Sequence, residues 1–121
     1  MTMKILAVDD SVTMRDMLRL TLSEAGFEVH LAEDGLDGLE ALKVLKPDVI
    51  ITDINMPRLD GFGFVDEVRK NSELRGVPIL VLTTESGAAL KQRARNAGAT
   101  GWIVKPYEEM KLIQTIRRVA A

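Results

Sequence analysis

Short apolar runs alternate along this chain with longer stretches whose apolar residues recur every three or four positions. The short runs, which predict strands, lie at residues 4–8, 27–32, 49–52, 79–82 and 102–104. The periodic stretches, which predict helices, lie at residues 12–25, 62–71, 88–97 and 108–121, with one more between Asp34 and Pro47. Five strands that each precede a helix imply right-handed βαβ crossovers. We therefore expect an α/β protein built on an open parallel sheet.

Residues at the boundaries of these stretches match the requirements of helix ends. Ser11 or Thr13 can cap the first helix, and Gly26 suits the position just past its end. Asp34 can cap the second helix, which Pro47 stops. The 121 residues contain no repeat, linker or low-complexity segment, so we expect a single domain over residues 1–121.

Composition excludes several classes of function. The chain has no cysteine, which removes disulfides, thiolate metal sites and cysteine nucleophiles. His30 is its single histidine, and its place in an alternating strand predicts a structural or exposed role. A net charge of −2 argues against general nucleic-acid binding. No apolar run approaches the roughly 18 residues of a membrane span, so we expect a cytoplasmic monomer that binds no membrane.

Polar side chains follow four of the five predicted strands, at the point where each strand ends. They are Asp9 and Asp10 after the first strand, Asp53 after the third, Thr83 and Thr84 after the fourth and Lys105 after the fifth. The carboxyl ends of parallel strands meet at one edge of the sheet, where open α/β sheets bind ligands. The sequence therefore predicts that these residues form one site.

Three carboxylates in one cleft repel each other unless a cation lies between them. Magnesium suits such a site because it takes oxygen ligands, retains waters and shares phosphate oxygens. Lys105 and Thr83 can then meet phosphoryl oxygens through an ammonium group and a hydroxyl. Asp53 remains as a carboxylate nucleophile that can form an acyl phosphate. Taken singly, each residue also has an ordinary structural explanation, such as helix capping by the paired aspartates.

Four motifs in this order resemble the receiver domains of response regulators, of the type represented by CheY, over nearly the full length. The motifs are VDDS at residues 8–11, TDINMP at residues 52–57 with Gly61 after it, LTTE at residues 82–85 and Lys105-Pro106. The resemblance implies a flavodoxin-like (βα)5 fold with strand order 2-1-3-4-5 and helices on both faces of the sheet. It also implies a two-component signalling protein, with a histidine kinase as phosphodonor. Met14-Arg15, which follow Asp10-Ser11, resemble the chemotaxis branch more than the receivers of transcription factors.

The resemblance assigns roles at the metal and phosphorylation site. It implies that Asp53 is the phosphoacceptor, that Asp10 ligates Mg²⁺ directly and that Asp9 does so largely through water. The backbone carbonyl of Asn55 is the further metal ligand that it implies. Such a protein catalyses only its own phosphorylation and dephosphorylation and is not an enzyme in the usual sense.

Further roles concern the lifetime of the phosphoryl group and the conformational switch. Thr83 and Lys105 are expected to bind phosphoryl oxygens, and the Lys105–Pro106 bond is expected to be cis. Trp102 stands where the family usually has Tyr or Phe, the aromatic residue that responds when Thr83 moves. Asn55 and Glu85 lie two residues beyond Asp53 and Thr83, at positions that tune dephosphorylation in the family.

Charge is distributed unevenly between the two parts of the chain. Residues 86–121 carry seven basic and two acidic residues, a net charge of +5, whereas residues 1–85 carry a net charge of −7. A solvated basic face is the simplest explanation. The resemblance favours instead a docking surface for an acidic target, such as a component of the flagellar motor switch.

Three other functions fit parts of the pattern. A phosphate sink or phosphorelay intermediate would have the same site without direct output. A phosphatase of the haloacid-dehalogenase type also uses aspartate, threonine and lysine around magnesium, but its second aspartate follows the nucleophile by two residues, where this chain has Asn55. A flavodoxin-like cofactor binder needs a phosphate-cradling loop, whereas the first strand-to-helix turn here is acidic.

Overall fold

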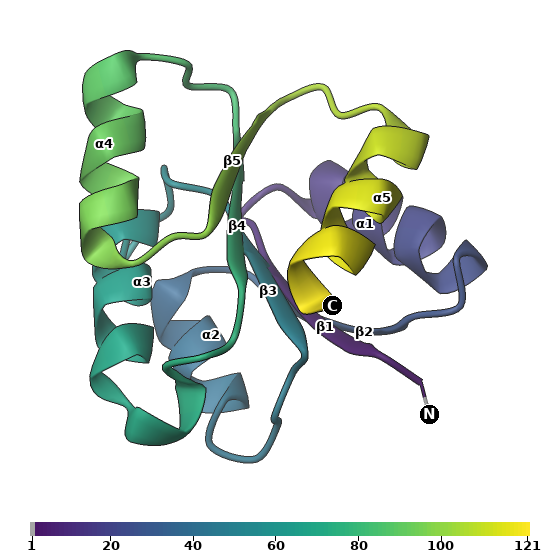
Figure 1. Cartoon of the computed structure of the whole chain (residues 1–121), viewed down its shortest axis with the longest axis horizontal. Coiled ribbons are helices and arrows are strands. Elements are labelled where there is room, and N and C mark those ends of the chain that lie inside the picture. Colours follow the sequence, from purple (N-terminus) through teal and green to yellow (C-terminus); the bar gives the residue numbers. More distant parts are fainter. Residues whose placement is uncertain (1) are drawn as a thin grey trace.

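A computed structural model describes residues 2–121 and shows one parallel sheet with helices on both faces (Figure 1). The strands are β1 (Lys4–Val8), β2 (Glu28–Ala32), β3 (Val49–Thr52), β4 (Ile79–Thr83) and β5 (Gly101–Val104). Their order across the sheet is β2-β1-β3-β4-β5, and every neighbouring pair is parallel. The expected fold class and strand order are confirmed.

The helices divide between the two faces of the sheet. Helices α1 (Val12–Glu24) and α5 (Glu109–Ala120) cover one face, and α2 (Gly35–Ala41), α3 (Gly61–Lys70) and α4 (Ala88–Ala97) cover the other (Figure 1). Successive side chains of a strand point to opposite faces, so Ile5 packs with α1 and α5 while Leu6 packs with α3. The inner strands β1, β3 and β4 are apolar on both faces for this reason.

Most of the predicted helix ends are present. The Ser11 hydroxyl accepts a hydrogen bond from the Met14 N–H at 3.2 Å, and the Asp34 carboxylate accepts one from the Asp37 N–H at 2.9 Å. Gly26 follows α1 with a φ of +93°, a conformation that favours glycine. These caps fix where α1 and α2 begin, directly after the loops that follow β1 and β2.

Two boundaries differ from the prediction. Helix α2 ends at Ala41 and does not continue to Pro47, because the N–H groups of Lys43 and Val44 bond to carbonyls three residues back and tighten the chain into turns. Helix α3 ends at Lys70, since Asn71 is extended and caps an unpredicted 3₁₀ helix, η1 (Ser72–Leu74). Neither difference alters the carboxyl edge of the sheet.

Backbone bonds continue the sheet past the ends of the strands, at the edge where the polar residues gather. The Asp9 N–H donates to the Ala32 carbonyl and the Asp53 N–H donates to the Val8 carbonyl, each at 3.0 Å. The Lys105 N–H donates to the Thr83 carbonyl at 2.7 Å. These bonds fix the backbone positions of Asp9, Asp53 and Lys105, the first residues after β1, β3 and β5.

Among residues 2–121, no helix is long and apolar enough to cross a membrane.

Candidate phosphorylation and metal site

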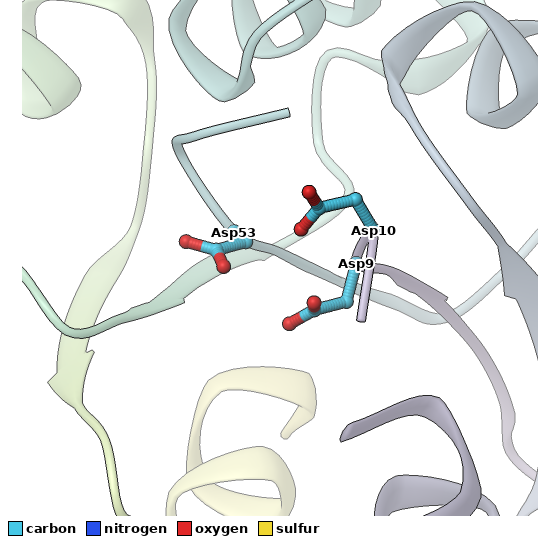
Figure 2. Close-up of side chains that lie close together, drawn as sticks. All are labelled: Asp9, Asp10 and Asp53. Carbon is cyan, nitrogen blue, oxygen red and sulfur yellow. The ribbon is translucent and has the colours of Figure 1, made fainter. Parts of the chain in front are cut away.

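Three carboxylates meet at the carboxyl edge of β1 and β3 (Figure 2). Asp9, Asp10 and Asp53 each offer an oxygen atom, and these atoms lie within 4.8 Å of one another. Strands β1 and β3 are neighbours in the sheet, so residues 44 positions apart come together. Asp9 and Asp53 are buried, with 1% and 8% of their surfaces exposed, whereas Asp10 is exposed. The acidic cluster expected from the sequence is therefore present.

Lys105 places one ammonium group between two of these carboxylates. Its Nζ donates to Asp9 Oδ2 at 2.7 Å and to Asp53 Oδ2 at 2.8 Å. Burial disfavours the ammonium, but the hydrogen bonds to Asp53 and Asp9 outweigh it and raise the pKa of Lys105. The side chain is thus charged at neutral pH. The Lys105–Pro106 bond is cis, as the resemblance implied.

The remaining groups of the cluster fit a divalent cation. Three carboxylates against one ammonium leave an excess of negative charge, and burial raises the pKa of Asp9 despite its hydrogen bonds to Lys105 and the Ser11 N–H. Within residues 2–121, the Asp10 carboxylate makes no hydrogen bond and the Asn55 carbonyl accepts none. Both groups are available as oxygen ligands of the hard kind that magnesium prefers.

Asp53 is held at one oxygen by the backbone and at the other by Lys105. Its Oδ1 accepts a hydrogen bond from the Ile54 N–H at 2.6 Å. Eight residues later α3 begins at Gly61, where a Cβ atom would overlap the Asp53 carbonyl oxygen. The absence of a side chain at Gly61 lets α3 begin against the residue that carries the carboxylate.

Thr83 lies at the end of β4 and is completely buried, whereas Thr84 is exposed. The Thr83 hydroxyl accepts a long hydrogen bond of 3.4 Å from the Glu85 N–H and makes none with Asp53. The structure therefore brings Thr83 to the expected edge of the sheet, where its hydroxyl makes only this long hydrogen bond.

Glu85 forms hydrogen bonds with both Asn55 and Trp102. Its carboxylate accepts a hydrogen bond from Asn55 Nδ2 at 3.2 Å, and its backbone carbonyl accepts one from Trp102 Nε1 at 3.0 Å. Trp102 also packs against the apolar cluster that contains Ile54 and Ala94. The loop that carries Glu85 thus connects the surroundings of Asp53 with β5. The resemblance placed Asn55 and Glu85 at positions that tune dephosphorylation, but their spacing in the sequence did not indicate that they touch.

His30 lies away from this edge, as expected. It is half-buried on the edge strand β2, and its Nε2 lies 2.7 Å from Glu28 Oε2. It is not part of the acidic cluster, which consists of Asp9, Asp10 and Asp53 among the described residues.

The fold and this site define a class of signalling proteins that accept a phosphoryl group on a receiver domain. The response regulator receiver domain family matches residues 5–117, and the chain belongs to this family. It is 41% identical to the chemotaxis protein CheY1 of Helicobacter pylori over 97% of this chain and 96% of that protein. It is 36% identical to the protein PilH of Pseudomonas aeruginosa over 98% of both chains.

Solved structures show the same relationship. The chemotaxis response regulator CheY4 of Vibrio cholerae is 46% identical and superposes with a TM-score of 0.93, over 98% of this chain and 99% of that one. A receiver domain of the sensor histidine kinase PA1611 from Pseudomonas aeruginosa, solved with magnesium in its active-site cleft, is 26% identical with a TM-score of 0.92, over 99% and 98% of the two chains. The chain is a response regulator receiver of two-component signalling.

Proposed function

We propose that Asp53 accepts a phosphoryl group from a histidine kinase and that this reaction requires Mg²⁺. The observation that carries the proposal is the pairing of a buried Asp53 carboxylate with Lys105 inside a cluster of three carboxylates. Asp10, Asp53 and the Asn55 carbonyl would hold the metal directly, and Asp9 would hold it largely through water. Bound magnesium supplies positive charge beside the phosphoryl oxygens.

The transfer follows from the environment of each group. A carboxylate oxygen of Asp53 attacks phosphorus, the bond from phosphorus to the donor's imidazole nitrogen breaks, and an acyl phosphate forms. Lys105 already faces Asp53, so its ammonium can meet the phosphoryl oxygens that arrive there. The Thr83 hydroxyl, which is only weakly engaged, can donate to another phosphoryl oxygen.

Removal of the phosphoryl group requires water to reach phosphorus opposite the Asp53 oxygen. Asn55 and Glu85 carry the side chains that we propose flank this path. Their hydrogen bond of 3.2 Å supports the proposal, because it holds an amide and a carboxylate together beside the loop that carries Asp53. In this proposal the protein catalyses both its own phosphorylation and this dephosphorylation, and the dephosphorylation limits the lifetime of the signal.

The output would be a changed surface formed by residues 86–121, which carry a net charge of +5. Thr83 and Trp102 are the proposed switch, connected through Glu85. We propose that residues 1–121 act as a monomeric, cytoplasmic single-domain receiver in chemotaxis. Its target would be an acidic protein, such as a flagellar motor switch component, and salt would weaken this binding by screening.

The test is the mass of the protein after treatment with acetyl phosphate and Mg²⁺. We expect one added phosphoryl group on the wild type and none on Asp53→Asn, whose amide has nearly the same shape but is not nucleophilic. Asp66→Asn, at an exposed position on α3, is the matched control and should react normally. A phosphoryl group on another residue of the Asp53→Asn variant would contradict the assignment.

A further inference from the structure

Arg58 forms a bidentate ion pair with Asp34, a residue of a different loop. Arg58 Nε lies 2.6 Å from Asp34 Oδ2, and Arg58 Nη2 lies 2.9 Å from Asp34 Oδ1. Asp34 is buried, with 3% of its surface exposed, and it also caps α2. Bidentate arginine–carboxylate pairs fix direction as well as distance. The pair therefore joins the β3–α3 loop to the start of α2 with a defined geometry.

The backbone at Arg58 has a conformation that few residues other than glycine adopt. Its φ is +65°, and among the described residues it is the one non-glycine residue with a positive φ. The Leu59 N–H donates to the Pro57 carbonyl at 2.7 Å, which closes a three-residue turn around Arg58. Turns of this kind with a positive central φ are rare and strained, so they persist where neighbouring contacts hold them.

This turn is the tip of the loop that begins at the proposed phosphoacceptor. The Gly61 N–H donates to the Ile54 carbonyl at 2.8 Å and closes the base of the loop. At the tip, the Gly35 N–H donates to the Leu59 carbonyl at 3.1 Å, beside the Arg58–Asp34 pair. The loop is thus held at both ends, and the two contacts at its tip reach the β2–α2 connection.

The last residue of β2, directly before this connection, supports the other half of the acidic cluster. The Asp9 N–H donates to the Ala32 carbonyl at 3.0 Å, two residues before Asp34. The end of β2 and the connection that follows it therefore support two segments, the residues after β1 and the loop after β3. The first of these carries Asp9 and Asp10, and the second carries Asp53 and Asn55.

We propose that Arg58 is a positioning residue, whose ion pair with Asp34 holds residues 53–61 so that Asp53 and the Asn55 carbonyl face Asp9 and Asp10. The inference rests on the proposed function of that cluster. The hydrogen bonds of the pair lower the pKa of Asp34 and raise the pKa of Arg58, so both side chains are charged at neutral pH. Arg58 acts through the loop, because its guanidinium bonds to Asp34 and not to a carboxylate of the cluster.

The test compares Mg²⁺ affinity and the rate of phosphorylation by acetyl phosphate in variants of the full chain. Arg58→Asn removes the pair but tolerates a positive φ. Asp34→Asn retains an oxygen that can cap α2 but loses the charge. We expect each variant to bind Mg²⁺ about 10-fold more weakly by calorimetry, the lower end of the effect seen when residues that orient metal ligands are changed. The double variant should bind no more weakly than either single variant.

Two further variants separate positioning from general stability. Arg58→Lys retains the charge but lacks the planar guanidinium that makes two hydrogen bonds to Asp34. We expect it to bind Mg²⁺ more tightly than Arg58→Asn and more weakly than the wild type. Lys70→Gln removes an exposed ion pair on α3 and should bind Mg²⁺ as the wild type does. All titrations are made at a temperature where circular dichroism shows each variant to be folded. If Arg58→Asn does not fold, Arg58→Lys and Asp34→Asn provide the same comparison.

The outcomes distinguish this inference from the proposed function. A wild type that binds Mg²⁺ and accepts phosphate, with Arg58 and Asp34 variants that do so equally well, overturns the positioning role alone. Variants that lose stability to urea but retain the wild-type Mg²⁺ affinity overturn it as well, because the pair would then stabilise the fold without positioning the ligands. A wild type that neither binds Mg²⁺ nor accepts phosphate overturns both proposals.

Discussion

Lys105 Nζ lies 2.8 Å from Asp53 Oδ2 and shares its charge with Asp9, so one ammonium compensates two buried carboxylates. Lys105→Met would leave both carboxylates without a counter-charge. We expect the free energy of unfolding at neutral pH, measured in urea without Mg²⁺, to fall by about 3 kcal/mol. Mg²⁺ should restore part of this loss. Lys111→Met, at an exposed position, is the control, and equal losses in the two variants would contradict the pairing.

Asp10 and Asp9 should contribute unequally to Mg²⁺ binding. The Asp9 carboxylate is already engaged by Lys105 and the Ser11 N–H, whereas Asp10 is exposed and unbonded within residues 2–121. We expect Asp10→Ala to weaken binding by more than about 10-fold and Asp9→Ala to weaken it less. Calorimetric titration with Mg²⁺ measures both. Equal losses, or none, would show that the ligand roles are wrong.

Trp102 should report activation through its fluorescence, because it is the single tryptophan of the chain. Its indole N–H donates a hydrogen bond to the Glu85 carbonyl. Movement of Thr83 toward a phosphoryl group would pull on the loop that carries Glu85. We expect little change in emission with Mg²⁺ alone and a clear change with beryllofluoride and Mg²⁺. Thr83→Ala should abolish the second change but still bind beryllofluoride. Constant emission in a protein that still binds its target would mean that Trp102 only packs.

The lifetime of the phosphoryl group should depend on the Asn55–Glu85 contact. Glu85→Leu replaces a carboxylate that can hold water with an apolar side chain that covers the path. We expect dephosphorylation of the purified protein to slow by about 5-fold, the effect of losing one hydrogen bond worth about 1 kcal/mol. Asn55→Leu should act in the same direction, and Mg²⁺ affinity should change little in Glu85→Leu. Unaltered decay in both variants would refute the proposed water path.

The Arg58–Asp34 pair should give stability a specific dependence on pH. The hydrogen bonds of Arg58 lower the pKa of Asp34 below its usual value of 3.8, so the folded state favours the carboxylate. This contribution is complete above pH 3.8 and is lost as pH falls through the lower pKa of the folded state. We expect wild type to lose more stability than Asp34→Asn between pH 5 and pH 2, a range of about three units around this transition. Parallel urea titrations of both proteins measure the difference.

The local sequence pattern was sufficient to predict the order of the strands and main helices and the residues at the carboxyl edge of the sheet. Neighbouring residues alone produce the apolar run at residues 49–52 and the helical spacing of residues 108–121. Parallel connectivity follows from the lengths of the chain segments that connect successive strands. Because parallel strands end at a common edge, Asp9, Asp53 and Lys105 could be placed together from the sequence alone. The strand order itself came from the family resemblance.

The contacts between loops required the tertiary structure. The pairs Arg58–Asp34, Asn55–Glu85 and Trp102–Glu85 join residues 24, 30 and 17 positions apart. The premature end of α2 at Ala41 likewise depends on how the turns after it pack.

The sequence by itself therefore determined which residues reach the carboxyl edge, because strand ends and βαβ connectivity are set by local periodicity and chain length. Only the tertiary structure decided which of those residues touch and which other residues support them. Loops have no periodicity from which a partner can be inferred, and their side chains meet only where the packing of the helices on the sheet brings the loops together. For this reason Lys105 was predicted to be in the site, whereas its position between Asp9 and Asp53, and the ion pair of Arg58, were not.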